Sequence, residues 1–460
     1  MSVRKTLIYL LDTIGWILSG LCISLAANCF LRVSSTSALP IVTAVCVGLA
    51  GLLLPFLFTL PLKGLRLRLC CYGTICLKAF LFSTTFSVIY QIRLLFLLLP
   101  DRWETALWSV LLCIGVEALL FWVGILVVYC CSHRLGLKLR LIGILCGLIP
   151  IANLVALLLI LRATTAEVGD EYQRQQLQKV RAAECPCATR YPVLLVHGVF
   201  FRDTHFFSYW GRIPAALTQN GARIYYGNQP SAASVADCSK LLADRIREIV
   251  LETGCEKVNI IAHSKGGLDS RWAIAMEGAA PYVASLTTVN SPHRGCAFVD
   301  YLLTKCPESV QQQIARTYNL TLGKLGEPSA DFLAAVADLT AEACIKREAL
   351  LADKEAALYA DAPSAGILRH SIGSQMDKAS GGGFPLNLTY HFPAFFDGPN
   401  DGLVAEGSFR WGDRYTYLTP TGDKGISHCD IIDQTGTVID GFDVREFYVD
   451  LVSELKILGL

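Results

Sequence analysis

Ser264 stands in the segment Lys257-Val-Asn-Ile-Ile-Ala-His-Ser-Lys-Gly-Gly267, where a short β-branched run ends abruptly at a serine. Two positions away on either side are the small residues Ala262 and Gly266. A serine on a tight strand-to-helix turn needs such neighbours, because the strained turn leaves no room for larger side chains. The pattern A-x-S-x-G therefore predicts a nucleophilic serine. By itself the pentapeptide is also typical of an ordinary turn with a surface serine, so partners must be found elsewhere.

A serine hydroxyl becomes a nucleophile when a base takes its proton and a third group holds the base. In nucleophile-elbow hydrolases these residues follow the chain order Ser, then Asp or Glu, then His. The histidines after the serine are His293, His370, His391 and His428. His428 lies in a polar loop before the last expected helix, whereas His391 sits in a strand-like run and His293 lies too close to Ser264 in sequence. We therefore expect His428 to be the base, and we interpret His293 as scaffold.

Two aspartates compete for the acid position. Asp401 lies in Asn400-Asp-Gly-Leu-Val404, which reads as a turn after a strand, and Asp397 lies just before it. The position favours Asp401 and leaves Asp397 open as the alternative.

An oxyanion hole requires two backbone N–H groups that point at the developing negative charge. One belongs to the residue after the nucleophile, Lys265. The other should come from the loop after the first strand, where His197-Gly198-Val199 stands. Both contributions are backbone, so the lysine side chain does not exclude the role.

The elements that must position these groups alternate between strand and helix from Tyr191 onward. Expected strands lie at 191–198, 222–226, 257–262, 283–290, 386–392 and 414–418, and expected helices at 213–220, 234–254, 268–276, 330–360 and 444–458. This alternation predicts a parallel sheet with helices on both faces. Ser264 then lies at the C-terminal end of a central strand, where open α/β sheets hold their ligands. The α/β-hydrolase fold has this layout.

The first third of the chain has a different character. The 460 residues are 53% hydrophobic and 17% charged, with a mean hydropathy of +0.44, which is too apolar for a fully soluble protein. Residues 1–161 carry 12 Lys/Arg and 4 Asp/Glu, and residues 162–460 carry 28 and 35. We expect a membrane module over 1–161, a juxtamembrane linker over 162–190 and a hydrolase domain over 191–460. The soluble half has no basic patch, which argues against a nucleic-acid partner.

Apolar runs long enough to cross a bilayer lie at about 6–30, 39–62, 69–90, 106–131 and 141–161. Five crossings are therefore expected. Eight Lys/Arg fall on the side of the N-terminus and three on the other, so the positive-inside rule places the N-terminus in the cytoplasm and the hydrolase domain on the extracytoplasmic side.

Three ionisable residues, Asp12, Lys78 and Glu117, lie within these runs. Such groups are functional candidates, and Lys78 could pair with Glu117. Alternatively, Asp12 and Lys78 reach the interface and Glu117 bonds a neighbouring helix. Eight of the 18 cysteines lie after residue 161, an even count that permits disulfides without specifying them.

The soluble half resembles the secreted bacterial triacylglycerol lipases of the Pseudomonas/Burkholderia type. The resemblance rests on five segments in the family's order: 191–198, 257–267, Ser291-Pro-His-Arg-Gly295, 400–404 and His428-Cys-Asp-Ile-Ile-Asp-Gln434. It implies Ser264 as nucleophile, Asp401 as acid and His428 as base, with Val199 and Lys265 as oxyanion donors. The chain departs from the family at Ala262, where the family usually has Gly, and at Gly407, where the family has a disulfide cysteine. The membrane module is also foreign to the family.

The resemblance further implies a structural calcium ion, Ca2+, beside the catalytic histidine. Calcium prefers hard oxygen ligands. Asp430 matches one family carboxylate, Gln434 and Val438 match the backbone-carbonyl ligands, and Asp377 is the best candidate for the second carboxylate. The alternative is that Asp430 merely caps the loop.

The sequence therefore predicts a membrane-anchored carboxylic ester hydrolase, a lipase or esterase acting on lipid or ester substrates through an acyl-enzyme. One alternative is a phospholipase or acyltransferase that acts on membrane lipid. Another is a non-catalytic membrane sensor with a hydrolase-like domain. Residues 306–328 stand where these lipases carry a mobile lid. The sequence does not indicate an oligomeric state.

Overall fold

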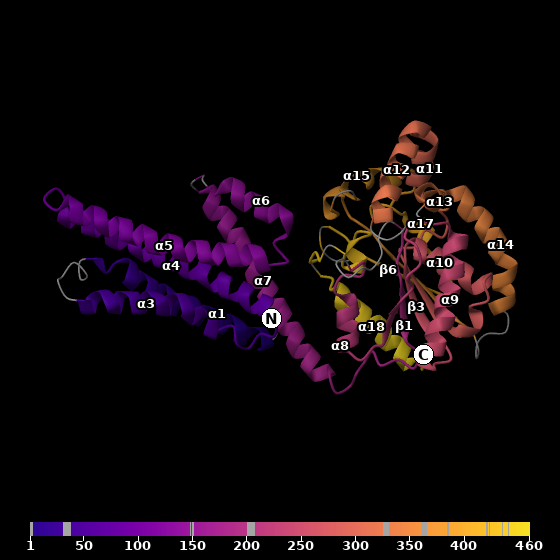
Figure 1. Ribbon diagram of the computed structural model, residues 1–460, viewed down its shortest axis with the longest axis horizontal. Helices are drawn as coiled ribbons and strands as arrows, with labels where there is room; N and C mark the ends of the chain where they lie inside the picture. Colours follow the sequence, from indigo (N-terminus) through magenta and orange to yellow (C-terminus); the bar gives the residue numbers. More distant parts are fainter. Residues whose placement is uncertain are drawn as a thin grey trace. The chain divides into compact units, whose positions relative to one another are not determined.

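The computed structural model describes residues 3–30, 38–147, 149, 151–199, 208–324, 331–359, 366–383, 386–419, 422, 424–434, 436–439 and 441–460. The chain divides into two compact units, Met1–Val180 and Arg181–Leu460. Figure 1 shows the helices of the first unit and the mixed helices and strands of the second.

The second unit is built on a six-stranded sheet in the order β2-β1-β3-β4-β5-β6. All neighbouring strands run parallel. The strands are β1 Val193–Val196, β2 Ile224–Tyr226, β3 Val258–His263, β4 Val283–Val289, β5 Leu368–Ser374 and β6 Arg414–Leu418. Parallel strands joined by helices on both faces confirm the expected α/β-hydrolase fold.

Alternate side chains of each strand pack into two cores on opposite faces of the sheet. Val193 and Leu195 face α8 (Ile213–Gln219) and α18 (Val444–Ile457). Leu194 and Val196 face α9 (Val235–Thr253) and α10 (Lys265–Ala275). Figure 1 shows these two helix pairs on either side of the strands.

The connection from β4 to β5 is the longest of the domain and is mainly helical. It contains α11 Ala297–Lys305, α12 Glu308–Lys324, α13 Phe332–Ala337 and α14 Ala341–Tyr359. The remaining short helices are α15 Leu386–Thr389, α16 His391–Phe396, α17 Glu406–Phe409, and the 3-10 helices η1 Ala280–Tyr282, η2 Ala379–Gly381 and η3 Asp430–Ile432. Figure 1 shows α11, α12 and α13 together at one end of the sheet.

One strand prediction is wrong. The expected strand at 386–392 forms α15 and α16, and the fifth strand is instead β5, at 368–374. Leu-Asn-Leu-Thr alternates as a strand would, whereas β5 contains Arg, His, two Ser and Gly and reads as polar. β5 exists because β4 and β6 pair with it on both sides, which is tertiary context that local pattern does not carry.

The first unit consists of helices α1 Val3–Ala27, α3 Ala38–Leu57, α4 Leu65–Leu98, α5 Trp103–Cys131, α6 Gly136–Cys146 and α7 Ala152–Arg181. Five of them, all except α6, are long and apolar enough to cross a membrane by length and composition.

The fifth expected span does not form one helix. Residues 141–161 are shared between α6, which ends at Cys146, and α7, which begins at Ala152. Gly143 of α6 lies against Ile160 of α7, where an added Cβ would come within 3.1 Å of the isoleucine Cδ1. The two helices therefore pack as a hairpin. α7 also continues to Arg181 without a break at the expected boundary of 161.

Glu167 of α7 links this hairpin to the end of the helical bundle at which α6 begins. Its carboxylate accepts hydrogen bonds from Ser132 Oγ at 2.6 Å and from the Arg134 N–H at 3.1 Å, both in the turn between α5 and α6. It also accepts one from Arg66 Nη1 at 2.7 Å, near the start of α4. The chain thus enters α6 and leaves the apolar part of α7 at the same end of the bundle.

The ionisable residues inside the helices are paired differently from the suggested Lys78–Glu117 contact. Lys78 Nζ donates to Asp12 Oδ2 of α1 at 2.6 Å. Glu117 of α5 instead accepts hydrogen bonds from hydroxyls of α4, those of Ser83, Thr84 and Ser87. The structure thus confirms the expectation that Glu117 bonds a neighbouring helix.

Candidate active site

Ser264 occupies the turn between β3 and α10 with φ 54° and ψ −130°. An L-residue adopts such a backbone only under tight constraint. The turn is pressed against the end of β1: a Cβ on Gly266 would lie 2.4 Å from the His197 carbonyl oxygen, and one on Gly198 would lie 2.8 Å from Ser264 Cβ. Glycine at these two positions lets the segment after β1 approach the serine, which is the packing that a nucleophile elbow requires.

Asp401 and His428 form a buried pair. His428 Nδ1 lies 2.5 Å from Asp401 Oδ2, and the His428 backbone N–H donates to the Asp401 carbonyl at 2.8 Å. The aspartate is 0% exposed and the histidine 6%. With Nδ1–H donating to the carboxylate, the other ring nitrogen, Nε2, is left to accept a proton.

Three further N–H donors fix the Asp401 carboxylate. Asn290 Nδ2 donates to Oδ2 at 2.7 Å, and the backbone N–H groups of Leu403 and Val404 donate to Oδ1 at 3.0 and 2.8 Å. These donors fix the orientation of the carboxylate against the His428 ring. Asn290 itself has φ 47°, a conformation that asparagine tolerates better than most residues.

The three residues predicted as a catalytic set come together at the carboxyl edge of the sheet. Ser264 follows β3, Asp401 lies between β5 and β6, and His428 follows β6. The ring of His263, which precedes the serine, lies 4.5 Å from the His428 ring by centroids. The sheet thus brings together segments more than 100 residues apart in sequence.

The competing residues have other surroundings. His293 is buried, bonds Thr288 Oγ1 at 3.0 Å and stacks on Trp411 at 5.4 Å between centroids. His391 is exposed at the start of α16, and Asp397 is exposed at its end. Neither contacts the pair of Asp401 and His428 through any interaction among the described residues.

A relay of hydrogen bonds runs beside the site. The Gly198 N–H donates to Tyr209 Oη at 2.9 Å, and this hydroxyl lies 2.7 Å from His263 Nδ1. Complete burial lowers the pKa of His263 well below its ordinary value, with the neighbouring His428 acting in the same direction. A neutral His263 does not repel a protonated His428.

The same relay decides which backbone groups are available as oxyanion donors. The Gly198 N–H is occupied by Tyr209, whereas those of Val199 and Lys265 have no acceptor in the described part of the chain. Val199 and Ser264 line one cavity, and Lys265 begins α10 directly after the serine. The geometry therefore brings both predicted donors to the serine.

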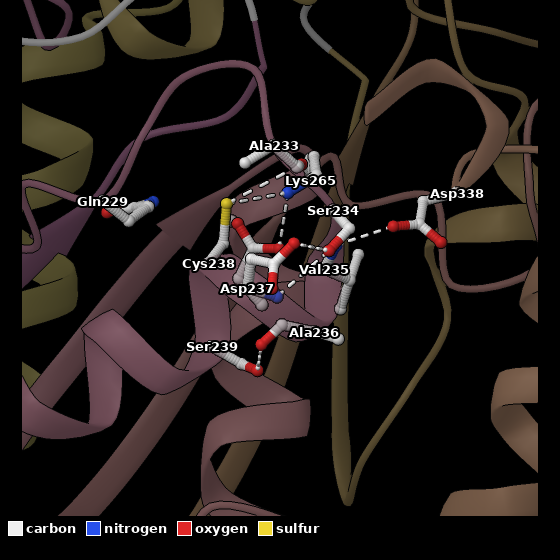
Figure 2. Close-up of polar contacts among 12 residues, drawn as sticks. Gln229, Ala233, Ser234, Val235, Ala236, Asp237, Cys238, Ser239, Lys265 and Asp338 are labelled. Carbon is white, nitrogen blue, oxygen red and sulfur yellow. Dashed lines mark hydrogen bonds and ion pairs between the residues drawn. The ribbon is translucent and has the colours of Figure 1, made fainter. Parts of the chain in front are cut away.

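The Lys265 side chain is buried away from solvent, at 1% exposure. Nζ donates to Asp269 Oδ1 one helical turn later at 2.8 Å and to Cys238 Sγ on α9 at 3.3 Å (Figure 2). Burial alone would lower the pKa of Lys265, but Asp269 and Cys238 raise it overall. Lys265 is thus the cation of a buried ion pair within α10, and its hydrogen bond to Cys238 links α10 to the start of α9.

An apolar cavity of about 150 Å³ opens beside Ser264. Its walls include Val299 and Leu303 of α11, Ile314 of α12 and Val336 of α13. These helices belong to the β4–β5 connection, part of which was expected as a lid. An apolar cavity beside a nucleophile suits the hydrocarbon part of a substrate.

The four residues expected to hold calcium differ in burial and in their local contacts. Asp430 is buried and its Oδ2 accepts from Ser427 Oγ at 2.6 Å, whereas Asp377 is exposed and its Oδ1 accepts from Gln375. The Gln434 N–H donates to the Cys429 carbonyl, and Val438 is 40% exposed. No group of three or more His, Cys, Asp or Glu among the described residues could hold a metal ion. The implied calcium needs only two carboxylates and two backbone carbonyls, and it stays a prediction.

An ion pair holds the loop that follows His428. Asp433, 3% exposed and with φ 57°, receives Arg212 Nε at 2.7 Å and Nη2 at 2.5 Å, together with the Arg212 backbone N–H at 2.8 Å. A bidentate guanidinium–carboxylate contact of this kind restrains geometry well.

Sequence reasoning missed Asn290, Tyr209 and the Arg212–Asp433 pair. Asn290 carried a weak signal, since it stands at the end of a predicted strand directly before Ser291-Pro292. Tyr209 and Arg212 carried none, because their partners lie 54 and 221 residues away.

Curated proteins with similar sequences include bacterial triacylglycerol lipases. A triacylglycerol lipase of Burkholderia plantarii is 36% identical over 172 residues, covering 35% of this chain and 47% of the relative. A triacylglycerol lipase of Pseudarthrobacter phenanthrenivorans is 36% identical over 171 residues, covering 34% and 53%. The chain thus spans about half the length of the curated relatives it matches. No protein-family model matches.

A solved lipase of Bacillus licheniformis in its mature form is 22% identical, with a TM-score of 0.42, over 58% of this chain and 92% of that chain. At this identity and TM-score the likeness adds nothing to the sequence comparison. The second unit is therefore similar in sequence to bacterial triacylglycerol lipases, and it has the α/β-hydrolase fold.

Proposed function

We propose that this protein is a membrane-anchored serine hydrolase that cleaves carboxylic esters of lipids. The observation that carries the proposal is the buried Asp401–His428 pair beside a serine in a strained elbow. Similarity to curated triacylglycerol lipases supports the ester class.

In the proposed mechanism, His428 Nε2 takes the proton of Ser264 as its Oγ attacks the ester carbonyl. The N–H groups of Val199 and Lys265 stabilise the tetrahedral oxyanion. Asp401 holds the imidazole in the required tautomer and stabilises the imidazolium. His428 then protonates the leaving alcohol, and water activated by the same ring releases the acyl group from Ser264.

The apolar cavity beside Ser264 supports a fatty acyl group as the part of the substrate that this site binds. The wall residues, half of which come from α11, α12 and α13, are almost all apolar, so a hydrocarbon chain would be desolvated there. We therefore propose that the substrate is a lipid ester rather than a small polar ester.

We propose further that the hydrolase unit lies on the cytoplasmic side of the membrane, and not on the outer side that five crossings would give. Support comes from the contacts of Glu167, which join both ends of the α6–α7 hairpin at one end of the bundle. A hairpin that enters and leaves on one side leaves four crossings, through α1, α3, α4 and α5. The chain then leaves the bundle, toward Val180 and beyond, from the end that carries Arg66 and Arg134. This end is the basic one, which the positive-inside rule places in the cytoplasm.

The state of the cysteines agrees with this side. All 18 are free, and thiols persist in the reducing cytosol. Cys238, within contact of Lys265, is an example of a cysteine used as a buried thiol.

The central test is covalent labelling of the nucleophile. A fluorophosphonate probe should label the folded full-length protein at Ser264 and should not label the Ser264→Ala variant, which should also lose hydrolysis of p-nitrophenyl butyrate and octanoate. EDTA should leave both signals unchanged, because the ion pair of Arg212 and Asp433 restrains the histidine loop. Absence of labelling in the wild type would favour a non-catalytic sensor, and loss of labelling in EDTA would support the calcium site.

The two candidate acids can be separated by matched substitutions. Asp401→Asn should lower kcat about 10⁴-fold, because an amide stabilises the wrong histidine tautomer. Asp397→Asn, at an exposed position, should leave kcat within about twofold. Steady-state kinetics with p-nitrophenyl octanoate measures both. The assignment is wrong if the larger loss belongs to Asp397→Asn.

Chain-length preference tests the acyl cavity. Val336→Phe adds volume to its wall and should lower kcat/KM for p-nitrophenyl octanoate about tenfold, while that for p-nitrophenyl acetate changes little. Triolein and a phospholipid of the same acyl chains, assayed in parallel, distinguish lipase from phospholipase activity. Equal losses on acetate and octanoate would show that the chain binds elsewhere.

Sidedness can be read from the exposed Cys185. A membrane-impermeant maleimide should label the peptide containing Cys185 only after cells are permeabilised, and the Cys185→Ser variant should lack that labelled peptide under both conditions. Labelling of Cys185 in intact cells would contradict four crossings and would return the domain to the outer side.

A further inference from the structure

A lateral groove in the helical unit has no part in the proposed hydrolysis. It encloses about 740 Å³ and is lined by one face of each of three helices. α1 contributes Tyr9 and Trp16, α4 contributes Phe82, and α7 contributes Leu158. Residues spaced by three, four or seven positions line up on one helix face, so the three helices present continuous stripes to the groove.

Charged groups lie within this mostly apolar surface. The ion pair of Lys78 and Asp12 forms part of the wall, with its side chains 19% and 11% exposed. Arg162 of α7 also lines the groove, is exposed, and forms no ion pair with a described residue. Lys78 Nζ has three protons and gives one to Asp12. The groove therefore has a net positive charge and unused N–H donors.

The position of Arg162 along the bundle suits a lipid head group. Glu167 is bound to the turn after α5, at the basic end of the bundle. Arg162 precedes it by five residues, or about 7.5 Å of helical rise. A guanidinium at this depth can extend toward the membrane interface while its stem stays among apolar side chains.

We propose that this groove binds a phospholipid of the leaflet at the basic end of the bundle. Arg162 and Lys78 would contact the phosphate, and one acyl chain would lie along Phe82 and Leu158. Charge complementarity selects a lipid that bears a phosphate over a neutral diacylglycerol, because guanidinium and ammonium groups make strong charge-assisted hydrogen bonds with phosphate oxygens. The proposal rests on the proposed membrane location but not on ester hydrolysis.

The test uses the full-length Ser264→Ala protein, so that hydrolysis cannot consume the lipid and a failure of the proposed enzyme activity has no bearing on the result. Dioleoyl phosphatidylglycerol and dioleoylglycerol, which share their acyl chains, are titrated separately into protein in detergent, and bound lipid is counted by native mass spectrometry. The phospholipid should bind and the diacylglycerol should not. Inorganic phosphate should not displace the phospholipid.

Two variants locate the site. Arg162→Gln should weaken phospholipid binding about tenfold, the loss expected for one charge-assisted contact. Leu158→Trp should also weaken it, by filling the groove without a change of charge. Arg93→Gln, an exposed arginine of α4 that does not line the groove, is the matched control and should bind as the parent does. Equal binding of dioleoylglycerol, or an equal effect of Arg93→Gln, would overturn the proposal.

Discussion

The geometry of the site depends on the left-handed backbone of Ser264. That conformation turns the chain sharply from β3 into α10, and it is compatible only with glycines at the points where the end of β1 touches the turn. The same contact aligns Val199 with the serine. Ser264 and one proposed oxyanion donor are therefore positioned by a single close approach of two strand ends, and the other proposed donor follows the serine in sequence. Strain at one residue is sustained because the parallel sheet on both sides of β3 holds it.

Much of this arrangement could be predicted because its determinants are local. The elbow needs small residues at fixed offsets, and the loops of Asp401 and His428 have polar compositions in the right order along the chain. β5 could not be predicted, because its residues are strand-forming only between β4 and β6. Asn290 could be placed at a strand end, but its bond to Asp401 joins residues 111 positions apart. The Arg212–Asp433 pair is likewise visible only after folding, and it occupies the loop for which sequence resemblance suggested a metal.

In the membrane unit, hydropathy identified the apolar segments but not their path. One 21-residue span and a hairpin of two shorter helices can have nearly the same hydropathy. The structure distinguishes them by the break between Cys146 and Ala152. In the proposed topology, this one break changes an odd number of crossings into an even one. The proposed side of the hydrolase unit therefore depends on contacts of a single carboxylate, that of Glu167, with the turn between α5 and α6. This is also the leaflet in which the proposed phospholipid groove lies.

The buried pair of Lys265 and Asp269 has a consequence for how this protein can vary. Loss of either partner alone would leave an uncompensated charge in a buried interior, immediately beside Ser264, and that penalty is larger than the net benefit of the intact pair. The two positions are thus expected to change together across evolutionary time, as one heritable unit. Descendants that replace the lysine with a neutral side chain should carry a neutral residue four positions later as well.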